Sequence, residues 1–107
     1  MRLTAEWKST VTQEGETATF FFRNPTNKEL SDFLDERYEL GRKGKVSDHT
    51  LAARSEFFDK LLKRVENLEG EDGNPITGPD RAAEIPVNWK GNIIFRHFED
   101  IEVDEKN

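Results

Sequence analysis

The sequence predicts a single α+β domain in which an N-terminal β-hairpin is followed by three α-helices packed as a small bundle. Three observations lead to this prediction. Apolar residues alternate with polar ones near the N-terminus, three later segments repeat apolar residues at helical spacing, and the eight Phe and two Trp are clustered. The chain has 107 residues and no internal repeat, so we expect one domain over residues 1–107.

Composition limits the possible function classes. Charged residues make up 36% of the chain against 34% hydrophobic ones, a balance that would suit disorder only if the apolar residues were dispersed. The formal net charge of -6 argues against a general nucleic-acid binder, which is usually basic. The chain has no Cys, which excludes disulfides, thiol catalysis and Cys-type zinc sites.

The hairpin is predicted over residues 3–23. Residues 3–11 alternate apolar and polar side chains, and residues 17–23 are rich in β-formers after a turn that contains Gly15. In the second strand, Phe20 and Phe22 would share one face with Ala18, which leaves Phe21 on the other face.

The first helix is predicted over residues 27–40. Pro25 ends the preceding strand, and Thr26 with Glu29 fits a capping box. Gly41 is a plausible C-terminal cap. The buried stripe of this helix would be formed by Leu30, Phe33, Leu34 and Tyr38.

Two further helices follow a short basic linker at residues 42–45. The pattern over residues 49–69 is the clearest in the chain, and a turn-rich loop at residues 70–79 comes after it. Pro86 favours the start of a last helix over residues 86–102, ahead of an acidic tail at residues 103–107. The stripe of the last helix would consist of Val87, Lys90, Ile94, Phe98 and Ile101.

No motif indicates catalysis or metal binding. The acidic turn at residues 69–75 lacks the ligand spacing of a calcium loop, and His49 and His97 have no partner at ligand spacing. The segment 41–45 lacks the spacing of a phosphate-binding loop. We therefore expect no enzyme activity, no catalytic residue, no metal, no cofactor and no small-molecule substrate.

Large apolar side chains beside the helical stripes are the remaining candidates for function. They either pack in the core or line a groove that accepts an apolar partner helix or a neighbouring subunit. The candidate partner-binding residues are Phe57, Phe58, Trp89, Ile93 and Phe21.

Three segments read together resemble a known family. They are residues 21–26, which lead into an acidic helix, residues 54–62, and residues 85–90 followed by Ile93 and Ile94. In this order they resemble the tail assembly chaperones of tailed bacteriophages and prophages. The resemblance implies a non-enzymatic protein that binds the tape measure protein, or another tail protein, and keeps it soluble during tail assembly. It also implies self-association, because many copies would coat one elongated client.

Other functions stay open at this point. One is a structural tail completion or connector subunit of the virion, and another is an acidic inhibitor that imitates DNA. No apolar run exceeds three residues and the N-terminus lacks the apolar region of a signal peptide, so we expect no membrane partner and a location in the host bacterial cytoplasm.

Overall fold

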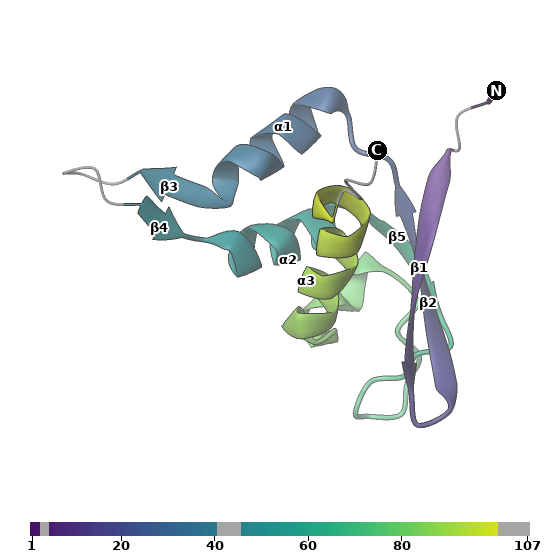
Figure 1. Cartoon of the computed structure of the whole chain (residues 1–107). Helices are drawn as coiled ribbons and strands as arrows, with labels where there is room; N and C mark the ends of the chain where they lie inside the picture. The colour runs from purple at the N-terminus through teal and green to yellow at the C-terminus, as the bar shows by residue number, and fades with distance from the viewer. Residues whose placement is uncertain (3–4, 41–45, 101–107) are drawn as a thin grey trace.

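A computed structural model of the chain describes residues 1–2, 5–40 and 46–100. Its elements run in the order β1, β2, α1, β3, β4, α2, β5, η2, α3 and η3. β1, β2 and β5 form one antiparallel sheet in the order β1-β2-β5, and α2 and α3 lie against one of its faces (Figure 1). The prediction of an α+β fold with an N-terminal hairpin and three α-helices is confirmed.

The hairpin consists of β1 (Glu6–Gln13) and β2 (Glu16–Arg23), which pair in unbroken register. Glu14 and Gly15 join them with φ angles of 53° and 84°, the two positive values that a two-residue type I′ turn requires. Phe20 and Phe22 are fully buried on the inner face with Ala18, whereas Phe21 faces the opposite way, as predicted.

α1 (Asn27–Glu36) begins with the predicted capping box. The Thr26 hydroxyl accepts a hydrogen bond from the Glu29 N–H at 3.1 Å, and the Thr26 N–H donates to the Glu29 carboxylate at 2.9 Å. Arg23 donates two further hydrogen bonds of 2.9 Å to the same carboxylate. The bonds from Arg23 have the largest effect, followed by the bond from the Thr26 N–H, and together they lower the pKa of Glu29 to about 2.

The predicted end of the first helix is wrong. α1 stops at Glu36, and Tyr38 opens β3 (Tyr38–Leu40), which pairs with β4 (Val46–Asp48). The Arg37 carbonyl accepts from the His49 N–H at 2.8 Å, so a long-range contact replaces the next helical turn. As a result Tyr38, expected in the buried stripe, is 52% exposed. Gly41 and the linker 42–45 lie outside the described residues.

The second predicted helix is also too long. α2 (Thr50–Leu61) is followed at once by β5 (Leu62–Glu66), which pairs with β2. A β-bulge at Lys63 explains the error, because the extra residue lets Leu62 and Val65 both face the core opposite Phe22 and Phe20. Leu62 and Val65 therefore face inward three positions apart, which is also the spacing of residues on one face of a helix.

The last helical region is shorter and less regular than predicted. After the 3-10 turn η2 (Pro79–Glu84), α3 (Val87–Ile94) changes at Phe95 into a π-helical turn, η3 (Phe95–Glu99). Val87, expected in the stripe, is 44% exposed. The wider turn places His97 and Phe98 against Trp7 and ends with the Asp100 N–H bonded to the Phe95 carbonyl. Ile101 and the acidic tail 103–107 lie outside the described residues.

Aromatic rings join the sheet to the helices. Phe58 of α2 contacts Phe20 and Phe22 edge to face, with ring centres 5.7 and 5.1 Å apart. Phe33 of α1 stacks on Phe57 of α2 at 4.4 Å. One core therefore serves all three helices and the sheet.

Candidate functional site

Three of the five candidate partner-binding residues are core residues in this fold. Phe57 is 3% exposed, Ile93 1% and Phe58 0%. No partner could contact Phe57 or Phe58 unless the core opened, so their position favours the core-packing alternative. Ile93 is also buried, although it forms part of the wall of a small cleft beside β1. The structure does not bring the five candidates together on one surface.

The other two candidates lie at the surface on different sides of the sheet. Phe21 faces outward and is covered by the Arg64 guanidinium, which lies 3.6 Å from the ring centre. Trp89 of α3 is partly buried, with its ring edge to face with Phe20 at 6.5 Å. Because Trp89 also lines open clefts, it is the candidate whose surroundings can accept a ligand.

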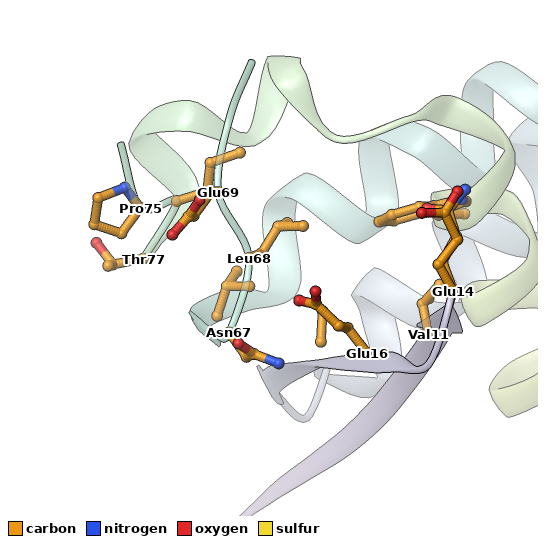
Figure 2. A pocket seen from close by; sticks show the side chains of 13 residues that line it. Val11, Glu14, Glu16, Asn67, Leu68, Glu69, Pro75 and Thr77 are labelled. Atoms are coloured by element: carbon orange, nitrogen blue, oxygen red, sulfur yellow. The ribbon is translucent and has the colours of Figure 1, made fainter. Parts of the chain in front are cut away.

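Two adjoining clefts, of about 640 and 710 Å³, meet at Trp89. We call them together the Trp89 groove. Both are bounded by the tip of the β1-β2 hairpin and by the loop after β5. Figure 2 shows Glu14 and Glu16 on the hairpin side of the first cleft and Glu69 on the loop side. The apolar side chains that line the groove are those of Val11, Ala18, Val65, Leu68, Pro75, Ile76, Pro86 and Trp89.

Backbone hydrogen bonds hold the walls of the groove in place. The Val65 N–H donates to the Thr77 carbonyl and the Ile76 N–H to the Leu68 carbonyl, both at 2.9 Å. Asn67 turns the chain at a φ of 62°, and its side-chain amide donates to the Thr17 carbonyl at 2.7 Å. The loop is therefore fastened to both β5 and β2, which gives the groove two fixed sides.

The rim of the groove is acidic. Six carboxylates and one guanidinium line the two clefts, and the guanidinium of Arg81 already pairs with Asp72 and Glu84. The hydrogen bond from the Asn74 N–H has the largest effect on Asp72, and with the bonds from Arg81 it holds the pKa of Asp72 below its usual value. Among the described residues, the rim carboxylates without an ion pair are those of Glu14, Glu16, Glu69 and Glu71.

The groove presents apolar contacts together with negative charge. Within the described part of the chain, no three His, Asp or Glu side chains are grouped so that they could hold a metal ion. No helix among these residues is long and apolar enough to cross a membrane. What the groove offers is an apolar floor beneath free negative charge.

The sequence pointed to Trp89 but not to the acidic rim. Glu14 lies in the hairpin turn and Glu16 begins β2, whereas Glu69 and Glu71 lie in a loop more than fifty residues later. In a chain with 22 acidic residues, none of these four is distinctive. Only the pairing of β2 with β5 brings the two segments together.

Comparisons of the chain with family models, with curated proteins and with solved structures find no match. Function is therefore inferred from the chain's own residues.

Proposed function

We propose that this chain is a non-enzymatic assembly chaperone that binds a basic amphipathic helix of a client protein in the Trp89 groove. The observation that carries the proposal is the apolar floor, with Trp89 at the junction of two clefts, beneath a rim of unpaired carboxylates. Tryptophan is among the side chains that most often dominate binding energy at protein interfaces.

The shape of the groove supports a helical client. An amphipathic helix places apolar side chains at positions i and i+4 on one face, and the two adjoining clefts offer successive places for them. Lysine or arginine side chains that flank this face would then lie along Glu14, Glu16 and Glu69. The carboxylates would mainly speed association, and Trp89 would mainly slow dissociation.

The resemblance to tail assembly chaperones suggests which client this is. We propose the tape measure protein of a tailed phage or prophage, bound in the bacterial cytoplasm by several copies of this chain. A long helical protein that awaits assembly exposes apolar stripes, and a chaperone with an acidic surface would cover them and keep the complex soluble.

Co-expression with a tape measure protein of a tailed phage or prophage tests the proposal. We expect the two proteins to co-purify, and Trp89→Ala to weaken the complex at least 30-fold, about 2 kcal/mol. Val87→Ala is the matched control, because Val87 lies on the same helix, is exposed and does not line the groove. A client that is equally soluble alone and does not co-purify would contradict the proposal.

A second variant separates loss of binding from loss of folding. Glu69→Lys reverses an exposed rim charge and leaves the core intact, so we expect an unchanged melting temperature with at least tenfold weaker binding at low salt. Mass spectrometry of purified virions tests the alternative of a tail completion or connector subunit. A chaperone is absent from the finished particle, whereas a connector is present.

A further inference from the structure

The open edge of β1 is a second surface with the features of a binding site. The sheet order is β1-β2-β5, so β1 and β5 are its two edges. The edge of β5 is partly closed, because the Val65 N–H donates to the Thr77 carbonyl. No described residue pairs with the other side of β1.

The turn geometry determines which backbone groups this edge presents. In a hairpin with a two-residue loop, the pair that closes the loop, here Gln13 and Glu16, exchanges both hydrogen bonds, and bonded and non-bonded pairs then alternate. The N–H and C=O groups of residues 6, 8, 10 and 12 therefore point away from β2. The register has no bulge over its eight pairs, so these groups form a regular row that an extended chain could join.

Two clefts lie in succession along this edge. One, of about 140 Å³, is lined by residues 7–9 of β1 together with Ile93, Arg96 and His97. The next, of about 400 Å³, is lined by residues 10–12 together with Trp89, Asn92 and Arg96. Side chains at alternate positions of an added strand lie on one face, so successive inward side chains would meet successive clefts.

The charge along this edge is opposite to that of the Trp89 groove. The ionisable residues that line the two clefts are Lys8, Arg96 and His97, with no carboxylate. Arg96 is exposed and has no ion pair among the described residues. Burial holds the pKa of His97 below its usual value, so at neutral pH the positive charge comes from Lys8 and Arg96.

We propose that the β1 edge binds an extended acidic segment of a partner protein, which adds to the sheet as a fourth strand. The apolar side chains of the segment enter the two clefts, and its carboxylates pair with Lys8 and Arg96. A second copy of β1 is a poorer occupant, because antiparallel pairing of two such edges brings the same cations together.

Fluorescence anisotropy with a labelled seven-residue peptide of alternating valine and glutamate, titrated with the full chain, tests this proposal. We expect saturable binding, and at least tenfold weaker binding for Thr10→Pro, because proline removes an outward N–H without breaking the ladder to β2. Thr10→Val keeps this N–H and should bind like the wild type. Arg96→Glu should also weaken binding at least tenfold, and Arg96→Lys should restore most of it.

Three results would overturn the proposal. The first is equal binding of a peptide in which lysine replaces glutamate. The second is a concentration-dependent dimer, seen by sedimentation, that Thr10→Pro abolishes, since the edge would then belong to a second copy. The third is loss of peptide binding in Glu69→Lys with Arg96→Glu unaffected, which would place the peptide in the Trp89 groove.

Discussion

Replacing Glu99 by glutamine removes the charge that ties the end of η3 to α1 and α2. The Glu99 side chain is 4% exposed and accepts three hydrogen bonds, one from Arg37 at 2.7 Å and two from Arg54 at 2.7 and 2.9 Å. Burial alone would raise the pKa of Glu99, but the bonds from Arg54 and Arg37 outweigh burial and hold the pKa below its usual value. Glutamine has nearly the same shape, but its NH2 group replaces one of the two accepting oxygens, so the change removes the charge together with at least one of these hydrogen bonds.

The expected loss of stability follows from these contacts. Breaking a buried ion pair costs about 3–5 kcal/mol when the remaining charge stays buried. Arg37 and Arg54 are 25% and 23% exposed and can partly rehydrate, so we expect Glu99→Gln to lower the free energy of unfolding by about 2–3 kcal/mol. For a chain of this length the melting temperature should fall by about 10–15 °C.

Urea unfolding at several pH values is the assay. The ordinary pKa of Glu99 is 4.5 and its native pKa is lower, so its contribution is complete above about pH 4.5 and is lost as the pH falls through the native pKa. The difference between wild type and Glu99→Gln should therefore shrink in acid. Asp100→Asn, an exposed neighbour, is the control and should change stability by less than about 0.5 kcal/mol. A difference below 0.5 kcal/mol for Glu99→Gln at pH 7, or one that persists in acid, would refute the reasoning.

Three other predictions concern the turn, the core and the histidine beside Trp7. Glu14→Asn should raise the free energy of unfolding by about 0.5–1 kcal/mol in urea titrations, because asparagine tolerates the positive φ of this turn better than glutamate does. Phe58→Ala should lower it by about 3–5 kcal/mol, whereas a surface role for Phe58 predicts little change. His97 should titrate by NMR below its ordinary pKa of 6.5, and wild-type stability should fall as the pH drops below about 6.5, because the unfolded chain then binds the proton more readily.

Local signals in the sequence were sufficient where both partners of an interaction lie close together in the chain. The capping box of Thr26 and Glu29 spans four residues, and the inward and outward faces of β2 follow from strict alternation around Phe21. Such patterns depend on backbone geometry alone, so they could be predicted without knowledge of the tertiary fold.

The errors arose where distant residues decide the local structure. The bulge at Lys63 gives β5 a spacing that imitates a helix, and only the partner strand β2 distinguishes the two. The first helix ends at Glu36 because Arg37 forms hydrogen bonds with His49 and Glu99. Both partners are distant in the sequence, so the local pattern does not predict these contacts. Likewise, the π-helical turn at the end of α3 accompanies the packing of His97 on Trp7, a residue far away in the sequence.

The candidate site was predicted only in part for a similar reason. An aromatic side chain beside a helical stripe can belong either to the core or to an interface. The sequence pattern did not distinguish these two roles for Phe58 or for Trp89. Burial separates them, since Phe58 is enclosed by Phe20, Phe22 and Lys90, while Trp89 stands at the meeting point of open clefts. The acidic rim depends on strand pairing between residues fifty positions apart, which composition does not reveal.

Fluorescence of Trp89 tests the proposed groove most directly. Trp7→Phe makes Trp89 the only tryptophan, and it should be tolerated because the Trp7 indole N–H is buried without an acceptor among the described residues, while phenylalanine keeps a ring beside Phe22. This variant is titrated with an amphipathic helical peptide of leucine and lysine. We predict a saturable blue shift that weakens at least tenfold in Glu69→Lys. Because Trp89 also lines a cleft at the β1 edge, the acidic control peptide is tested in an Arg96→Glu background, where the shift should be absent when glutamate replaces lysine in the peptide. An unchanged spectrum, or an equal response to both peptides, would contradict the proposal that this groove binds a basic client helix.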